Sequence, residues 1–371
     1  MTKNGKRNGK SNGNGAPAGK HRTLKAPLVV IGGSAGGIEA LRQILPHLPR
    51  SFEAPILVVL HIAASSPGLL AQVLSRKSAL PVQEARDGEL IRPGRVYVAQ
   101  PDLHLTVDRD RIRLPLGPKE NRHRPSIDTL FRSAAWRYDG RVIGVLLTGN
   151  LNDGTAGLWA IKNSGGIAIV QDPAEADYPE MPANAVSEVK VDHVVCLRDI
   201  APVLQTVLAN QTNGAAKKRK KKAMNLETEI SEAKTPIEST SELGPPSCFT
   251  CPECNGTLFK VQEASLLRFR CHTGHSFTAE SLENGLSDEI ESALWFALRA
   301  LGEKSMLLRQ LADKAREKNH DLSLTLFEDK AKAVDQAACV LKEMLTARNG
   351  RSSRKPRSRR RPITKKENAQ P

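Results

Sequence analysis

The sequence predicts an α/β fold built on a doubly wound, mainly parallel sheet. Short apolar runs alternate with helical patterns between residues 26 and 209, and these runs are apolar throughout instead of half polar. Strands of a parallel sheet are covered by helices on both faces, which is why they read as continuous apolar runs. We predict strands at 28–31, 56–60, 96–99, 142–147, 167–170 and 194–197, and helices near 38–48, 67–76, 125–138 and 155–164.

Residues 103–114 follow a different pattern. Apolar and polar residues alternate on both sides of an Asp-Arg-Asp turn at 108–110. This alternation is typical of an antiparallel hairpin, which we expect to be added to the main sheet.

Composition divides the chain into six parts. The start is rich in Asn, Gly and Lys, a bias typical of disorder, and a later basic run followed by Glu, Ser, Thr and Pro indicates a linker. Cysteines then gather in a short segment, and leucines at helical spacing follow it. We predict a disordered basic tail at 1–25, an α/β domain at 26–209, a linker at 210–246, a small cysteine-containing unit at 247–278, a helical hairpin at 279–347 and a second disordered basic tail at 348–371.

The predicted helical hairpin rests on two apolar stripes separated by the break at 319–321. We favour packing of the two stripes on each other; a dimer or partner surface is the alternative. The stripes hold Ile290, Leu294, Leu298, Leu301, Leu308 and Leu311, then Leu322, Leu326, Val334, Leu341 and Leu345.

The formal net charge of +15 over 371 residues is concentrated in three runs. Segments 1–25, 217–222 and 351–366 hold 22 of the 55 basic residues and no acidic one, so the rest of the chain is mildly acidic. Such runs are ordinarily solvated; the functional alternative is a tether to an acidic partner, nucleic acid or an anionic membrane. They lack interleaved aromatic residues on which bases would stack.

No apolar stretch approaches the ~20 residues that a membrane span requires. The N-terminus is polar and basic, without the apolar core of a secretory signal. We therefore expect a cytoplasmic protein without a membrane span.

The glycine-rich stretch GGSAGG, residues 32–37, stands where a predicted strand gives way to a helix. A P-loop requires Lys-Ser/Thr after its last glycine, and Ile38-Glu39 stand there instead. The stretch does match Gly-x-Ser-x-Gly, the turn that exposes a nucleophilic serine between a strand and a helix. Ser34 is therefore a candidate nucleophile.

A nucleophilic serine needs a base and a group that orients the base. His61 ends the predicted strand 56–60, and Asp153 lies in the turn after the predicted strand 142–147. Taken alone, such a histidine ordinarily caps a strand and such an aspartate belongs to a turn. All three residues, however, follow core strands at the carboxyl edge of one sheet, where open α/β sheets place their sites.

The order Ser, His, Asp differs from the Ser, Asp/Glu, His order of α/β-hydrolases. A set of motifs over about residues 27–205 instead resembles the catalytic domain of the chemotaxis protein-glutamate methylesterases. These motifs are Gly33-Ser34-Ala35-Gly36-Gly37, Val58-Val59-Leu60-His61, Arg124-Pro-Ser-Ile-Asp128, Leu147-Thr-Gly149 through Asp153-Gly154, and Met181-Pro182 near Asn184-Ala185.

The resemblance implies hydrolysis of γ-glutamyl methyl esters on chemoreceptors, and often deamidation of receptor glutamines. It implies Ser34 as nucleophile, His61 as base and Asp153 as the orienting carboxylate, with no cofactor for catalysis. The backbone amides around Ala35, Gly149 and Asn150 are candidates for the oxyanion hole.

Two positions depart from the family pattern: Ala35 stands where Thr is frequent and Asn150 where Met is frequent. Both lie near the expected reaction centre, so rate or substrate preference is expected to differ. The family's usual phospho-receiver domain is also not seen in the 26 or so residues before the domain, so we expect no regulation by an attached aspartyl phosphate.

Six cysteines are too scattered for a disulfide framework. Cys251, Cys254, Cys271 and His275 have the spacing of two short knuckles around one structural zinc, with His272 and Cys248 as rivals for the last place. The segment resembles the ribbon-like extension that follows some methylesterase-type domains. From its distance in sequence, we expect this unit to be separate from catalysis. We expect Cys196 and Cys339 to be plain core residues.

Two alternatives to a receptor esterase remain open. One is a regulatory or nucleic-acid-binding protein that uses the zinc unit and the basic tails, with an inactive hydrolase domain. The other keeps the esterase but directs it to another methyl-esterified signalling protein.

Overall fold

The computed structural model describes residues 26–211, 222–234, 237–263 and 266–352. The predicted tail at 1–25 and most of the predicted tail at 348–371 lie outside these residues. The chain divides into two compact units, Met1–Leu282 and Glu283–Pro371, and each is described by itself.

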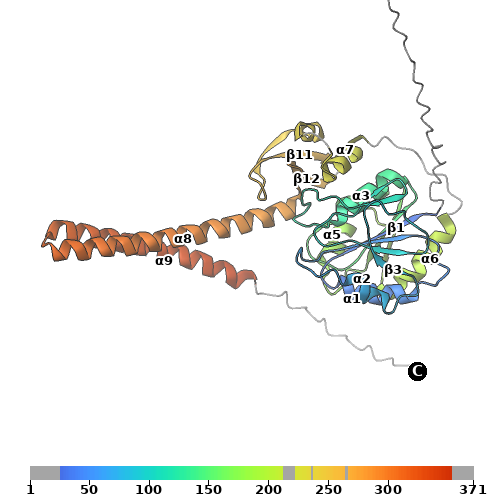
Figure 1. The fold of residues 1–371 in the computed structure, drawn as a ribbon, viewed down its shortest axis with the longest axis horizontal. Coiled ribbons are helices and arrows are strands. Elements are labelled where there is room, and N and C mark those ends of the chain that lie inside the picture. The colour runs from blue at the N-terminus through green and yellow to red at the C-terminus, as the bar shows by residue number, and fades with distance from the viewer. Residues whose placement is uncertain (1–25, 212–221, 235–236, 264–265, 353–371) are drawn as a thin grey trace, which may run out of the picture. The chain divides into compact units, whose positions relative to one another are not determined.

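A seven-stranded sheet with only parallel pairings forms the centre of the first unit (Figure 1), which confirms the predicted parallel sheet and adds the unpredicted edge strand β3. Its strand order is β3-β4-β2-β1-β7-β8-β9, so strands β2, β3 and β4 lie on one side of β1, and the chain then returns to build the other side from β7. The carboxyl ends of β1, β2 and β7 therefore meet where the strand order reverses, the usual position of sites in such sheets. The strands are β1 Leu28–Gly33, β2 Ile56–Leu60, β3 Val82–Glu84, β4 Val96–Val98, β7 Val142–Leu146, β8 Ile167–Gln171 and β9 His193–Val195.

Successive residues of β1 pack alternately into two different hydrophobic cores. Leu28 and Val30 face one core, whereas Val29 and Ile31 face the other, and all four are fully buried. This doubly apolar strand explains why the run lacks polar alternation. The first core is covered by α3 Ile127–Tyr138, α4 Thr155–Asn163 and α5 Glu180–Glu188, and the second by α1 Gly37–Ile44, α2 Leu70–Ser75 and α6 Ile200–Gln211.

The hairpin predicted at 103–114 forms, but it does not join the main sheet. Strands β5 Thr106–Asp108 and β6 Arg111–Arg113 make a separate two-stranded sheet. The backbone N–H of Val107 donates to the Ser133 hydroxyl of α3 at 3.2 Å. The hairpin is thus held against a helix, and the prediction that it extends the main sheet is wrong.

The segment predicted as a linker contains helix α7 Lys222–Ser231 and the 3₁₀ turn η3 Ile237–Leu243. Ile230 and Leu243 form a small core with Val261 of the next sheet. The prediction that 210–246 is a linker throughout is wrong. The many charged residues of this segment gave no sign in the sequence that part of it packs into a core.

A four-stranded antiparallel sheet follows in the predicted cysteine unit. Its order is β10-β11-β12-β13, and we call it, with its loops, the ribbon. Its strands are β10 Pro246–Thr250, β11 Thr257–Glu263, β12 Leu266–Cys271 and β13 Ser276–Thr278.

Five fully buried charged side chains join the ribbon and α7 to the α/β core. Glu120 bonds Arg132 of α3 at 2.7 Å and Arg270 of β12 at 2.8 Å, and Glu227 of α7 bonds Arg268 of β12 at 2.9 Å. Although burial favours the neutral acid, the Arg132 and Arg270 charges hold the pKa of Glu120 well below its usual range. Buried charges persist only when paired, so this cluster requires core, α7 and ribbon to stay together.

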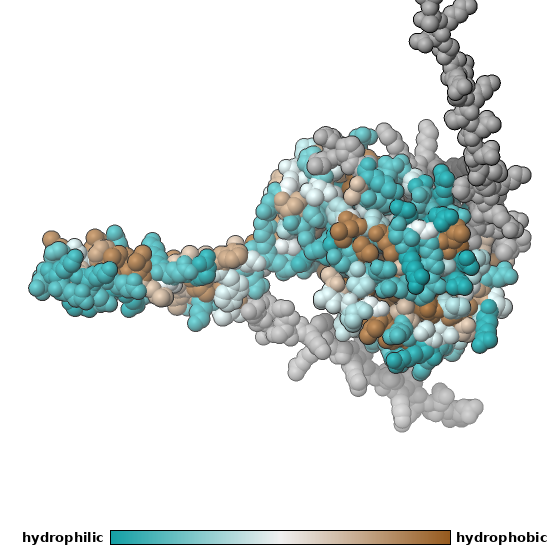
Figure 2. All heavy atoms as spheres, in the orientation of Figure 1, coloured by the Kyte–Doolittle hydropathy of each residue, from teal (hydrophilic) through white to brown (hydrophobic). Residues whose placement is uncertain are grey.

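The predicted helical hairpin forms as α8 Ala279–Glu317 and α9 Asp321–Ser352, with Asn319 at φ 54° in the turn. Helix α9 therefore continues five residues into the predicted tail. Leu308 and Val334 pack together, but Leu322 is 92% exposed and Ile290 52%, so the apolar stripes are only partly paired in this chain. Figure 2 shows brown hydrophobic side chains between teal ones along these helices.

Within the described part of the chain, no helix is both long enough and apolar enough to cross a membrane.

Glu227→Gln is expected to lower the free energy of unfolding by about 3–5 kcal/mol, because it leaves buried arginines without their carboxylate partner. Urea unfolding at pH 7, followed by tryptophan fluorescence, measures this. The control Glu229→Gln alters a partly exposed residue of the same helix and should change stability by less than about 1 kcal/mol. Equal stability of the two variants would contradict the structural importance of the cluster.

Candidate active site and metal centre

Ser34 follows β1 directly and begins the turn into α1. Its backbone N–H donates to the Thr148 carbonyl at 3.0 Å, which ties the turn to the end of β7. Gly36 caps α1 at φ 76°, a conformation that favours glycine. A Cβ on Gly149 would lie 2.8 Å from the Ser34 Cβ, so only glycine allows the two loops to approach this closely.

His61 follows β2, the neighbour of β1 in the sheet. Its backbone N–H donates to the Gly33 carbonyl at 3.2 Å. Its Nδ1 lies 3.1 Å from the Ser34 Oγ, and its Nε2 lies 2.7 Å from the Asp153 Oδ2. The structure therefore brings together the three residues predicted from separate strands.

Asp153 lies at the N-terminus of α3, which supplies much of its support. The backbone N–H groups of Ile127 and Asp128 donate to it at 2.7 and 3.2 Å, and the Ser126 hydroxyl donates at 3.0 Å. Asn121 adds a side-chain amide donor at 2.9 Å. The free amides and the dipole of a helix N-terminus favour a negative charge at this position.

The carboxyl groups of Asp153 and Asp128 are buried close together, and their pKa values are shifted in opposite directions. Burial favours neutral acids, but the hydrogen bond and charge of His61 lower the pKa of Asp153 below its usual range. Burial and the neighbouring Asp153 charge raise the pKa of Asp128 to about 8. Asp153 is therefore the ionised member at neutral pH.

His123 stacks on the His61 ring, with ring centroids 3.6 Å apart and planes 13° from parallel. Burial, followed by the neighbouring His61 charge, lowers the pKa of His123 to about 4. A second positive charge is thus kept away from the candidate base at neutral pH.

The three oxyanion candidates occupy different situations. The Gly149 N–H donates to the Tyr178 carbonyl at 3.0 Å, which argues against it as an oxyanion donor. Ala35 lies in the turn that leads into α1, and Asn150 is exposed on the loop after β7. Ala35 and Asn150 remain the candidates for this role.

Asn121, Ser126 and His123 are site residues that were not predicted from the sequence. Ser126 and Asp128 belong to the Arg124-Pro-Ser-Ile-Asp128 motif, so their position at the site had a signal in the sequence. His123 directly precedes that motif and Asn121 lies two residues before His123, in a loop without strand or helix periodicity.

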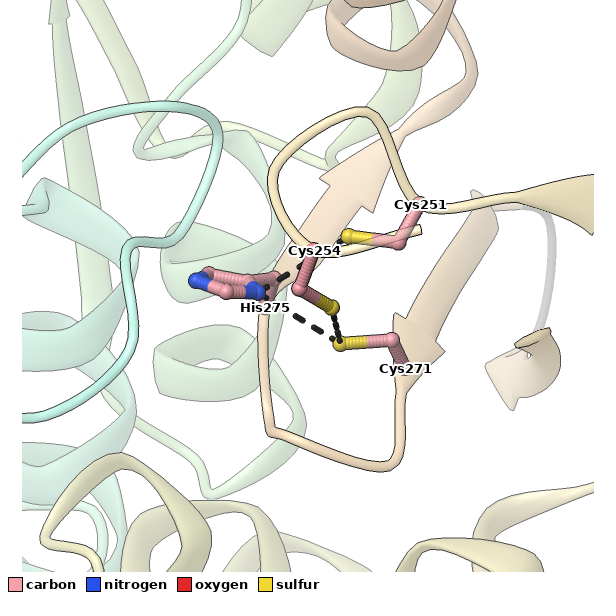
Figure 3. Close-up of side chains that lie close together, drawn as sticks. All are labelled: Cys251, Cys254, Cys271 and His275. Atoms are coloured by element: carbon pink, nitrogen blue, oxygen red, sulfur yellow. Dashed lines mark hydrogen bonds between the residues drawn. The ribbon is translucent and has the colours of Figure 1, made fainter. Parts of the chain in front are cut away.

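Cys251, Cys254, Cys271 and His275 converge in the ribbon (Figure 3). Their ligand atoms all lie within 4.8 Å of one another, and the closest pairs are 3.5 to 3.7 Å apart. A tetrahedral zinc with Zn–S bonds of about 2.3 Å has ligand separations of about 3.8 Å, so the donor set fits this metal.

The two rival ligands lie apart from this cluster. Cys248 is exposed on β10, and His272 makes an edge contact with the Phe259 ring, with centroids 4.4 Å apart. Among the described residues, the cluster comprises only the four first-choice ligands.

The prediction that the two remaining cysteines are core residues is wrong. Cys196 is partly exposed and Cys339 is exposed on α9. All six cysteines of the chain are free.

Comparisons with known proteins place the α/β domain. The family model of the CheB methylesterase matches residues 29–204. The putative protein-glutamate methylesterase/protein-glutamine glutaminase of Leptospira interrogans serogroup Icterohaemorrhagiae serovar copenhageni is 44% identical over 174 residues, which are 47% of this chain and 90% of that protein.

A second relative and a solved structure also match the α/β domain. The protein-glutamate methylesterase/protein-glutamine glutaminase of Salmonella typhi is 37% identical over 54% of this chain and 59% of its own length. The solved CheB methylesterase catalytic domain of Thermotoga maritima is 36% identical, with a TM-score of 0.48 over 50% of this chain and 100% of that one. From the extent and identity of the Leptospira match, together with the family match, this chain belongs to the CheB methylesterase family.

Proposed function

We propose that the protein is a serine esterase that removes methyl groups from γ-glutamyl methyl esters of chemoreceptors and deamidates receptor glutamines. The observation that carries the proposal is the continuous chain of contacts from Ser34 through His61 to Asp153. Its relatives bear the name protein-glutamate methylesterase/protein-glutamine glutaminase, which supplies the substrate class.

In this proposal, Ser34 attacks the ester carbonyl while His61 accepts the hydroxyl proton. His61 then donates that proton to the departing methoxide, so methanol leaves and an acyl-enzyme remains. A water molecule that gives its proton to His61 hydrolyses the acyl-enzyme, releasing the glutamate carboxylate and restoring Ser34. Asp153 orients the ring and stabilises the imidazolium formed in each half of the reaction.

The partner is a methylated chemoreceptor, with another methyl-esterified signalling protein as the alternative within the same chemistry. Free cysteines are typical of a reducing compartment, which supports a cytoplasmic location. The alternative of a regulatory or nucleic-acid-binding protein depends on basic runs that lie mostly outside the described residues. The intact site favours the esterase.

Zinc is proposed as a structural metal of the ribbon, held by Cys251, Cys254, Cys271 and His275. When bound, it would cross-link the two ribbon loops with all four positions filled by protein, which leaves none for a reacting water. No step of ester hydrolysis involves it.

Ser34→Ala and His61→Ala are expected to lower kcat for methanol release from methylated receptors by roughly 10⁴-fold or more, because the nucleophile or its base is lost. Asp153→Asn should retain more activity, since only orientation and charge stabilisation are lost. Exposed Ser75→Ala is the control and should match the wild type. Unchanged methanol release by folded Ser34→Ala would refute the assignment.

The lowered pKa of His123 makes stability depend on pH. Its unfolded pKa is about 6.5 and its folded pKa about 4, so the stabilisation is complete above pH 6.5 and is lost as pH falls toward 4. Protonation of the unfolded His123 should therefore lower the free energy of unfolding by about 2 kcal/mol between pH 7.5 and pH 5. Urea unfolding of the wild type and of His123→Phe at both pH values measures how the free energy of unfolding changes with pH. The same change with pH in both proteins would contradict the prediction.

Purified protein is expected to contain about one zinc per chain, because the ribbon has too small a core to fold without a cross-link. Cys254→Ser should lower the occupancy severalfold, whereas the non-ligand Cys248→Ser should leave it unchanged. Elemental analysis of protein prepared without chelator gives the answer. Full zinc occupancy in Cys254→Ser, or no zinc in the wild type, would rule out this site.

A further inference from the structure

We propose that the ribbon positions the catalytic carboxylate, with Asn121 as the positioning residue that connects them. The inference rests on the proposed function of Asp153. It replaces the expectation that the ribbon is separate from catalysis.

The Asn121 side chain makes four hydrogen bonds that connect the active site to residues 278–281. Its Nδ2 donates to Asp153 and to Asp128, each at 2.9 Å. Its Oδ1 accepts from the Thr278 backbone N–H at 3.0 Å and from the Ser281 hydroxyl at 3.1 Å. The side chain is almost fully buried and uses both its acceptor lone pairs and both its donors. Its orientation is therefore fixed jointly by the active site and by residues 278–281.

The backbone of the Asn121 loop is bound to the ribbon as well. The Asn121 N–H donates to the Ser276 carbonyl at 2.7 Å, and the Ser276 N–H donates to the Lys119 carbonyl at 3.3 Å. These two bonds form an isolated parallel bridge between Glu120 and Ser276, which ties residues 119–121 to the start of β13. Between them, Glu120 points into the charge cluster and bonds Arg270 of β12.

A second asparagine, the chain neighbour of the catalytic carboxylate, also contacts the segment 278–281. Asn152 directly precedes Asp153, and its Oδ1 accepts from the Thr278 hydroxyl at 2.7 Å. Its Nδ2 donates to Glu280 at the start of α8. Asn121, which bonds the Asp153 carboxylate, and Asn152, its chain neighbour, therefore both contact the same segment, 278–281.

The proposed zinc ligands lie next to this contact in the chain. His275 directly precedes β13, and Cys271 ends β12. Loss of the metal would release the β12–β13 connection and, with it, the strand that holds residues 119–121. Asp153 would keep its donors from α3 but lose the amide that separates it from Asp128.

Three full-length variants and the wild type test this coupling. Ser281→Ala removes one bond to Asn121 without affecting the metal, Cys254→Ser removes a metal ligand, and Cys248→Ser is the matched cysteine control. Hydrogen–deuterium exchange of residues 118–124 reports the loop, with β7 as the internal reference. Proton NMR of the low-field His61 ring N–H reports its hydrogen bond to Asp153. Neither readout depends on substrate.

In Ser281→Ala, exchange of 118–124 should rise by about tenfold, the consequence of losing about one hydrogen bond. In Cys254→Ser, which also loosens the Ser276 bonds to this loop, the rise should be at least as large. The His61 proton signal should broaden and move to higher field. The kcat for methanol release should fall roughly 10- to 100-fold with little change in KM, as expected when a reacting group is misplaced. Cys248→Ser and the exchange of β7 should not change.

Unchanged exchange and an unchanged His61 signal in both Ser281→Ala and Cys254→Ser would overturn the proposal. If Ser281→Ala and Cys254→Ser show the predicted changes in loop exchange and His61 signal but the wild type releases no methanol, the coupling stands and the proposed esterase function fails. If zinc is not present in the purified protein, Ser281→Ala alone decides the coupling.

Discussion

The burial of the Asp153 carboxylate against the N-terminus of α3 is the constraint on which the site depends. A buried carboxylate needs donors on all sides, and α3, Ser126, Asn121 and His61 supply them. This requirement fixes the approach of α3 to the end of β7 and sets the plane of the His61 ring. The ring in turn reaches Ser34, which the neighbouring strand delivers to the same edge of the sheet.

The same constraint explains why the ribbon belongs to the first unit. Of the groups around Asp153, Asn121 has no helix or main-sheet strand to hold it, and β13 together with Glu120 fixes its loop instead. The buried pairs of Glu120 and Glu227 with arginines of α3 and β12 hold that arrangement in place. In this account, a segment more than a hundred residues away completes the surroundings of the catalytic carboxylate.

Local patterns predicted the parts of the structure that depend on local sequence. The apolar runs predicted the parallel sheet, and the residues that follow three strands predicted Ser34, His61 and Asp153, which the structure brings together. The sequence could not show that Val107 bonds a helix instead of the sheet, or that Glu227 lies in a buried cluster, because both depend on distant partners. His123 and Asn121 escaped notice for the same reason, since a loop position gains its role only from the fold.

The central claim is that Ser34 is a nucleophile activated by His61. Reaction of the full-length protein with a fluorophosphonate, followed by peptide mass spectrometry, tests it without any assumption about the natural substrate. An activated serine displaces fluoride and keeps the phosphonyl group, so the account predicts one adduct, on Ser34, that forms far more slowly in His61→Ala. An adduct on another residue, or labelling of Ser34 at equal rates in wild type and His61→Ala, would contradict it.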